Sequence, residues 1–461
     1  MPRFRPHAMY PGALLAQEAC SYQAMTELLR GTRGRLVVLI HSDRDCSNVL
    51  PKVGGAVRAD LEYKFLCTNL KEDEMVTGQG NAKLRRAIEL VWASYRPDLV
   101  VVLSTCPTVM IGDNIKNVAS KAAADLQANV VAEITHGLRP KSPAEIVDLG
   151  YTLLTRGAAP AAIPDETRAR RVNLVGFDLY SDERREFEGA LAELGIGVNT
   201  ALDNGASLDA FLRVAGAGFN VHPGPNMMIG FDAQCRERFG IEPIEVPLPF
   251  GVGATDRFYR AIAAAVGVAA ARVDEVLGRR RAAAAAATGA FREGVMAPLR
   301  ARRGRAPRCA YNVGSVRSFE LRRIALEELG ELPFFEELGF EATLFIQGPQ
   351  DEANQRRTAA VLAALGVPNP FVVFPDPGGL ARFLEPGAYD LFYGTDFLRD
   401  QLTRVSLPLL HHRTLKMGYD HVAFGLDEIT HTLRSQGFYR HFRAPGPAPA
   451  QRRSLPVAPK G

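Results

Sequence analysis

The sequence predicts a doubly wound α/β protein. Short apolar runs alternate along the chain with helical patterns, and this order is typical of βαβ units around parallel sheets. The runs are rich in β-branched residues and bounded by Gly, Pro or polar residues, which indicates strands buried on both faces. They occupy Arg35–Ile40, Leu99–Leu103, Val172–Val175, Ala342–Ile346 and Phe371–Phe374. Helical patterns lie between them, at Asn81–Ser94, Glu183–Leu194, Thr255–Val266 and Gln355–Leu365.

Chain length and two interruptions of this pattern suggest a domain division. At 461 residues the chain exceeds the size at which a single core keeps growing, so two or three domains are expected. Residues 156–164 contain two prolines and no strand signal, as a linker would, and an Ala/Arg-rich helix is expected over Arg279–Ala301. We therefore expect α/β domains at residues 1–155, 165–300 and 305–440, followed by a flexible Pro-, Arg- and Ala-rich tail at 443–461.

The composition narrows the class of protein. Apolar residues make up 47% of the chain and charged residues 23%, an ordinary balance for a globular protein. The net charge of +4 is small and scattered, which argues against nucleic acid or an anionic membrane as a partner. No apolar stretch is long enough to span a bilayer, and the N-terminus lacks the apolar run of a signal peptide. A cytoplasmic protein without a membrane span is expected.

Three cysteines occupy positions where an α/β protein can hold a ligand. Cys46 follows the first predicted strand and Cys106 follows the second, at the carboxyl ends where such folds bind ligands. Cys20 begins a helical pattern that leads into the first strand. Three soft thiolates without closely paired Cys-x-x-Cys spacing suit iron–sulfur ligation better than zinc. From the residues alone, three unrelated buried thiols remain the alternative.

Several motifs resemble the component 1 family of nitrogenase-like enzymes, the molybdenum-iron protein and its relatives. The resemblance extends over about Met9–Leu433. It is carried by the three cysteines, by Cys67–Leu84 (CTNLKEDEMVTGQGNAKL) before a predicted helix, and by Ser104–Asn114 (STCPTVMIGDN). Further along, Pro247–Asp256 (PLPFGVGATD) is similar to a segment of the family's beta-type subunit.

The resemblance implies a fold, a cofactor and partners. The fold would consist of three Rossmann-like domains. Cys20, Cys46 and Cys106 would ligate an iron–sulfur cluster at an interface shared with a partner subunit, either an eight-iron P-cluster or a four-iron cluster. The partner would be a homologous alpha-type subunit in an α2β2 heterotetramer, and an ATP-hydrolysing homodimeric iron protein would donate single electrons. Cys67 matches no ligand of the family and is expected to be a buried structural thiol.

Two regions favour the beta type over the alpha type. Phe219–Pro225 has no cysteine where the alpha type carries a ligand of the catalytic cofactor, and Cys235 lies further on in a helical pattern. His411 and His412, ahead of Met417–Asp420, resemble the beta-type C-terminal motif. These histidines suit interface hydrogen bonds, metal binding or proton relay. The resemblance thus places the catalytic cofactor in the partner subunit.

The loop before Cys46 differs from nitrogenase itself. It reads HSDRD over residues 41–45, where nitrogenases carry a glycine-rich sequence. Asp43 and Asp45 are candidates for a fourth ligand, which would bind through oxygen. The alternative and preferred roles for these carboxylates are an ion pair with Arg44 or a contact with a docking partner. Neighbouring hydroxyls are candidate donors to the cluster or helix caps, namely Ser21, Ser47 and Thr105.

These differences favour a nitrogenase-like reductase over nitrogenase. Methylthio-alkane reductase is the preferred expectation within the family. A dark-operative protochlorophyllide or chlorophyllide reductase and a cofactor-assembly scaffold remain alternatives. The alternative from a different class is a sugar-binding or periplasmic-binding-like α/β module whose cysteines are merely buried.

Overall fold

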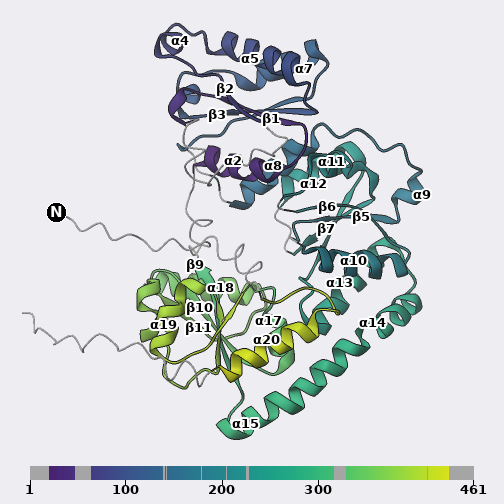
Figure 1. Cartoon of the computed structure of the whole chain (residues 1–461), viewed down its shortest axis with the longest axis vertical. Coiled ribbons are helices and arrows are strands. Elements are labelled where there is room, and N and C mark those ends of the chain that lie inside the picture. The colour runs from purple at the N-terminus through teal and green to yellow at the C-terminus, as the bar shows by residue number, and fades with distance from the viewer. Residues whose placement is uncertain are drawn as a thin grey trace, which may run out of the picture. The chain divides into compact units, whose positions relative to one another are not determined.

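Three parallel β-sheets with flanking helices make up the fold (Figure 1). The computed structural model describes residues 20–46, 64–138, 141, 143–177, 179–203, 205–224, 228–315, 329–412 and 414–435. All strand pairs in this part of the chain are parallel. The doubly wound α/β class predicted from the sequence is therefore confirmed.

The secondary-structure elements have the following bounds. The strands are β1 Leu36–His41, β2 Lys64–Cys67, β3 Leu99–Ser104, β4 Val130–Glu133, β5 Arg171–Val175, β6 Gly197–Leu202, β7 Phe219–Pro223, β8 Glu242–Val246, β9 Arg308–Ser315, β10 Glu341–Gln347, β11 Phe371–Phe374, β12 Leu391–Gly394 and β13 Leu409–His411. The α-helices are α2 Ser21–Gly31, α4 Glu72–Val76, α5 Gly80–Tyr95, α6 Cys106–Met110, α7 Ile115–Leu126, α8 Pro143–Thr155, α9 Asp165–Arg168, α10 Ser181–Glu193, α11 Leu208–Leu212, α12 Ile229–Phe239, α13 Gly251–Val266, α14 Ala270–Phe291, α15 Ala297–Arg303, α17 Leu332–Leu338, α18 Glu352–Ala364, α19 Arg399–Arg404 and α20 Val422–Arg434.

The first sheet, ordered β2-β1-β3-β4, has helices on both faces (Figure 1). Its central strands β1 and β3 are buried at every position. Successive side chains of a strand point to opposite faces, so β1 contributes to two cores. Val37 and Leu39 lie in a core formed with α5 and α7, whereas Leu36, Val38 and Ile40 lie in a core formed with α2 and α8.

The second sheet, ordered β6-β5-β7-β8, shares a core with the first. Val175 and Leu202 of the second sheet belong to the same buried cluster as Val38 of the first. Helix α8 packs against α2, α11 and α12, and so connects the helices that cover the two sheets. The contacts place both sheets in one compact unit, made of the described residues within 20–285, 329–333 and 417–422.

The third sheet, ordered β11-β10-β9-β12-β13, forms a second compact unit. A buried carboxylate fixes the start of two of its strands: Asp390 lies 2.8 Å from Arg303 and 2.8 Å from Arg305 in ion pairs. The same carboxylate accepts a hydrogen bond from the backbone N–H of Arg308 at 2.9 Å. Such pairing is needed because an uncompensated buried charge is strongly destabilising.

The long Ala/Arg-rich helix is confirmed, and it begins earlier than the sequence suggested. Helix α14 starts at Ala270, and a π-helical segment at Arg292–Met296 joins it to α15. Residues 156–164 contain no helix or strand, and their role as a linker stays a prediction. The three-domain boundaries stay a prediction, and the tail at 443–461 lies outside the described residues. Among the described helices, none has the length and apolarity needed to cross a membrane.

Candidate functional site

The three predicted cysteines lie at one edge of the first sheet. Cys46 lies in a helical segment that begins at Arg44, shortly after β1, and Cys106 is the first residue of α6, shortly after β3. The two loops are neighbours because β1 pairs with β3 up to His41 and Ser104. Cys20 is the N-cap residue of α2, which packs on the same sheet. All three thiols are half-buried.

The sulfurs of Cys20 and Cys106 face a common point at Gly137. A methyl group placed on Gly137 would lie 3.6 Å from each of these two sulfurs. The Gly137 backbone N–H also donates a hydrogen bond to the Cys106 sulfur at 3.2 Å. The pKa of Cys46 is raised mainly by burial, and the nearby Asp43, Cys106 and Cys20 act in the same direction. The fold therefore brings together the three thiols that the sequence singles out.

The fourth cysteine of this region, Cys67, has a different environment. Its thiol lies within hydrogen-bonding distance of the carbonyl oxygens of Ser42 (3.5 Å) and Asp43 (3.3 Å). Its sulfur also accepts a hydrogen bond from the Asn69 backbone N–H at 3.2 Å. Cys67 thus links the end of β2 to the loop after β1, and it is half-buried where the sequence suggested a buried thiol.

The charged loop before Cys46 is organised by Asp43. One carboxylate oxygen of Asp43 accepts hydrogen bonds from the backbone N–H groups of Asp45 (3.0 Å) and Cys46 (3.2 Å). The Ser42 hydroxyl donates to the same oxygen at 3.3 Å. Asp43 therefore shapes the turn that presents Cys46.

Hydroxyl groups connect the two cysteine loops. The Thr105 hydroxyl donates to that of Ser42 at 2.8 Å, and the Thr108 hydroxyl donates to the carbonyl of His41 at 3.1 Å. Ser21, beside Cys20, accepts a hydrogen bond from the Lys141 backbone N–H at 3.0 Å. Ser47 lies outside the described residues. Thr105 and Ser21 thus position the loops and helix that carry Cys20, Cys46 and Cys106.

Sequence reasoning missed a buried His–Asp pair that joins three of the motifs. His41 Nε2 lies 3.0 Å from Asp113 and its Nδ1 lies 3.1 Å from the Thr68 hydroxyl. Burial lowers the pKa of His41, although Asp113 acts in the opposite direction. Gly80 permits the pair, because a side chain there would clash with the Asp113 carboxylate. This contact explains why Cys67–Leu84 has a glycine at position 80 and Ser104–Asn114 an aspartate at position 113.

Asp113→Ala should lower the free energy of unfolding by about 1–3 kcal/mol, because it leaves the buried His41 ring without one of its two partners. The measurement is the urea unfolding midpoint of the full chain. Asp125→Ala is the matched control, since that carboxylate is 63% exposed and pairs with Arg85 at the surface. Equal effects of the two substitutions would contradict a special role for the buried pair.

The remaining predicted residues lie elsewhere. Cys235 is buried in α12, where burial raises its pKa to about 12. The rings of His411 and His412 stack with centroids 4.4 Å apart at the end of β13. His412 Nδ1 lies 3.3 Å from the Gly394 carbonyl oxygen, and His411 lies 3.7 Å from Asp396. Both histidines belong to the second compact unit, whereas the three thiols belong to the first.

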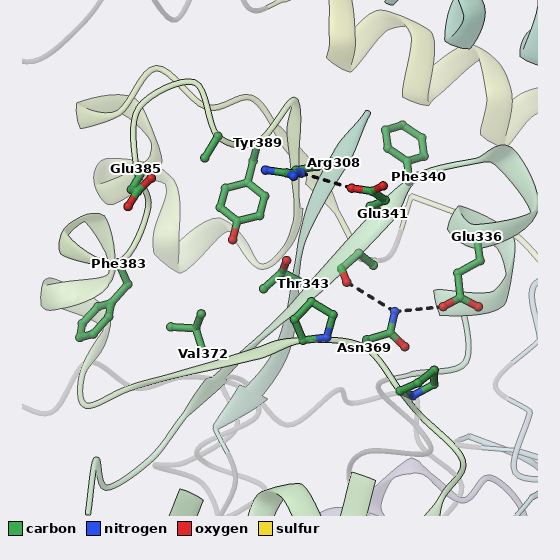
Figure 2. Close-up of a pocket in the computed structure, with 14 residues that line it drawn as sticks. Arg308, Glu336, Phe340, Glu341, Thr343, Asn369, Val372, Phe383, Glu385 and Tyr389 are labelled. Carbon is green, nitrogen blue, oxygen red and sulfur yellow. Dashed lines mark hydrogen bonds and ion pairs between the residues drawn. The ribbon is translucent and has the colours of Figure 1, made fainter. Parts of the chain in front are cut away.

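A cleft of about 740 Å³ lies in the second unit, at the amino ends of β9, β10 and β11 (Figure 2). Three of the charged residues that line it have partners there: Arg308 lies 3.3 Å from Glu341, and Glu336 accepts a hydrogen bond from the Asn369 amide at 3.0 Å. Its lining includes aromatic side chains but neither cysteine nor histidine. The cleft therefore offers no thiolate or imidazole group for a metal.

Residues 32–296, more than half of the chain, match the family model of nitrogenase component 1 type oxidoreductases. The chain belongs to this family. The match covers the sheet edge with Cys46 and Cys106, together with the second sheet. The prediction of an oxidoreductase of the nitrogenase-like family is thereby confirmed.

Individual members of the family show partial similarity. One subunit of the light-independent protochlorophyllide reductase of Heliobacterium modesticaldum is 26% identical over 44% of this chain and 39% of its own length. The nitrogenase iron-molybdenum cofactor biosynthesis protein NifE of a Nostoc species is 26% identical over 77% of this chain and 70% of its own. This chain therefore spans about two fifths of the length of the protochlorophyllide reductase subunit.

Solved structures agree on the fold. A chain described as nitrogenase Cp1 at pH 6.5 superposes with a TM-score of 0.62 over 95% of this chain and 92% of its own, at 16% sequence identity. At that identity the likeness concerns the fold alone. It confirms the nitrogenase component 1-like α/β architecture.

The residues present fit an iron–sulfur cluster, which membership of the family implies. Three thiols are available at one sheet edge, and a backbone N–H already donates to one of the sulfurs. Cys20 and Cys46 pack against the apolar core, an environment that helps to tune cluster potentials. Across the described parts of the chain, no three His, Cys, Asp or Glu side chains converge closely enough to hold a single metal ion.

Proposed function

We propose that the chain is the beta-type subunit of an ATP-dependent nitrogenase-like reductase in the cytoplasm, with methylthio-alkane reductase as the preferred activity. The observation that carries the proposal is the convergence of Cys20 and Cys106 on Gly137, with Cys46 beside them. These three thiolates would ligate an iron–sulfur cluster shared with a homologous alpha-type subunit in an α2β2 heterotetramer. When bound, the cluster would relay single electrons from an ATP-hydrolysing homodimeric iron protein to a catalytic site held mainly by the alpha-type subunit.

The chain's own residues would hold and orient the ligands. Asp43 fixes the turn of Cys46 through two backbone N–H groups, and Thr105 connects that loop to the helix that starts at Cys106. On binding, each thiol would lose its proton to become a thiolate ligand. The Gly137 N–H would remain as a donor to the Cys106 sulfur.

Exposed apolar side chains beside the thiols support a partner at this edge. Met110 is 74% exposed and Ile111 41% exposed at the end of the helix that Cys106 begins. Ile134 and Leu138, which flank the Gly137 loop, are 41% and 64% exposed. Apolar groups gathered on a surface commonly mark an interaction site, as a cluster shared between subunits would require.

The deciding experiment is the iron and acid-labile sulfide content of the anaerobically purified complex with its alpha-type partner, with electron paramagnetic resonance of the oxidised and reduced states. About eight irons per interface cluster would support a P-cluster and a reductase of small molecules. About four would favour the tetrapyrrole-reductase alternative, to which the similarity to a protochlorophyllide reductase also points. An iron-free complex would overturn the proposal.

The similarity to NifE favours a second candidate, a cofactor-assembly scaffold that carries a cluster without turnover. Reconstitution with the iron protein and ATP separates the two. Reduction of a methylthio-alkane would support the preferred activity, and reduction of protochlorophyllide the tetrapyrrole alternative. An iron-loaded complex that reduces neither substrate would favour the scaffold.

A further inference from the structure

Gly137 occupies a special place between two of the thiols. Its N–H donates to the Cys106 sulfur at 3.2 Å, and the side-chain position that it leaves empty faces the sulfurs of both Cys20 and Cys106 at 3.6 Å. We propose that Gly137 is a positioning residue for the cluster, with an amide that sets its reduction potential and a missing side chain that leaves room for it. This inference rests on the proposed function.

The loop that carries Gly137 is held to the strand that carries Cys106. The Thr135 backbone N–H donates to the Ser104 hydroxyl oxygen at 2.9 Å, and the Thr135 hydroxyl donates to the Ser104 carbonyl at 2.7 Å. The Ser104 hydroxyl donates in turn to the Thr135 carbonyl at 3.2 Å. Both residues are buried. Because Ser104 lies two residues before Cys106 and Thr135 two residues before Gly137, these bonds hold the Gly137 loop beside the start of α6.

Backbone conformation does not account for a glycine at this position. Gly137 is not among the described glycines that have a positive φ, so an alanine can adopt its backbone without strain. In the metal-free chain an added methyl group would make only ordinary contacts of 3.6 Å with the two sulfurs. Glycine is required only when a cluster fills the space between the two sulfurs, because an added methyl group would then compete for that space.

The hydrogen bond has a defined electrostatic effect. An N–H dipole that points at a ligating sulfur stabilises the reduced, more negative state of an iron–sulfur cluster and so raises its reduction potential. A weaker bond from Gly137 should therefore shift the potential in the negative direction. The three bonds between Ser104 and Thr135 make this donor rigid, and its contribution depends on them.

Two variants test the two parts of the proposal in the complex with the alpha-type partner. Gly137→Ala should fold normally, with an unchanged melting temperature when metal-free, yet retain iron about tenfold more weakly against a chelator. Thr135→Val loosens the loop without filling the space, so it should keep its iron and show a more negative potential in a titration followed by electron paramagnetic resonance. Wild-type iron retention in Gly137→Ala would overturn the part of the proposal that concerns the missing side chain. A wild-type potential in Thr135→Val would overturn the part that concerns the amide.

Gly224→Ala is the matched control. Its added methyl group would also meet its nearest neighbours at 3.6 Å, but these are Glu245 and Val246 at the end of the second sheet, so iron and potential should stay at wild-type values. Loss of iron in Gly224→Ala would count against the inference, because glycine replacement in general would then explain the result. A wild-type complex without iron would instead overturn the proposed function itself.

Discussion

Cys106→Ala is expected to remove most of the iron from the complex and to increase the ATP hydrolysed per product formed. Cys106 begins α6 at the carboxyl end of β3, and its sulfur faces the same point as that of Cys20. Alanine offers no ligand there, and removal of one of three thiolates weakens the attachment of the whole cluster. The measurement is iron and acid-labile sulfide per complex after anaerobic purification, together with ATP hydrolysed per product.

Cys67→Ser is the matched control for this prediction. Cys67 lies at the same sheet edge, but its thiol is engaged with the backbone of Ser42, Asp43 and Asn69, contacts that a serine hydroxyl can reproduce in part. We expect wild-type iron content for this variant. Full iron in Cys106→Ala, or a loss in Cys67→Ser as large as that in Cys106→Ala, would show that the ligands are assigned wrongly.

The strands that could be predicted are those whose side chains are apolar on both faces. β1 and β3 are buried at every position and stand out as continuous apolar runs. β7 and β8 are equally part of a sheet, but each contains a proline and polar residues. In β7 the polar Asn220 is buried because it accepts a hydrogen bond from Asn173 of β5 at 2.8 Å. Such compensation depends on the pairing of strands and cannot be seen in a linear pattern.

The site was predictable to the extent that it depends on strand ends. The positions of Cys46 and Cys106 follow from the rule that ligands lie at the carboxyl ends of parallel strands. The role proposed for Gly137 could not be foreseen, because β4 is only four residues long and a glycine in the loop after it indicates no more than a turn. The His41–Asp113 pair was hidden for a similar reason, since it joins residues far apart in sequence through a particular strand register.

The C-terminal motif Met417–Asp420 has a structural role that sequence reasoning did not assign. Two buried carboxylates of α10 accept hydrogen bonds from its backbone: Glu183 from Met417 at 2.7 Å, and Glu186 from Tyr419 at 2.5 Å and Asp420 at 3.1 Å. Gly418 has a φ of +100°, and a side chain there would clash with the Glu186 carboxylate. The motif glycine is thus required by the close approach of this segment to α10.

Glu186 should make stability depend on pH. Burial is the main cause that raises the pKa of Glu186 to about 7, and the negative charge of Asp420 adds to it. Hydrogen bonds from the backbone N–H groups of Tyr419 and Asp420, and the charge of Arg280, act in the opposite direction. The folded chain therefore keeps a proton that the unfolded chain releases above a pKa of 4.5. The contribution of Glu186 to the free energy of unfolding is fully present below pH 4.5 and is lost as pH rises through 7. This contribution is roughly 3 kcal/mol at most.

Glu186→Gln removes the titration of this carboxyl and keeps the size of the side chain. The amide has one acceptor oxygen for two backbone donors, so the variant should be less stable than wild type at pH 5 by about 1–3 kcal/mol. Because glutamine does not titrate, the gap should narrow as pH rises from 5 to 8. The measurement is the urea midpoint at each pH, with Glu188→Gln as the control because that side chain is 49% exposed on the same helix. A gap that stays constant across this range would show that Glu186 is already ionised at pH 5.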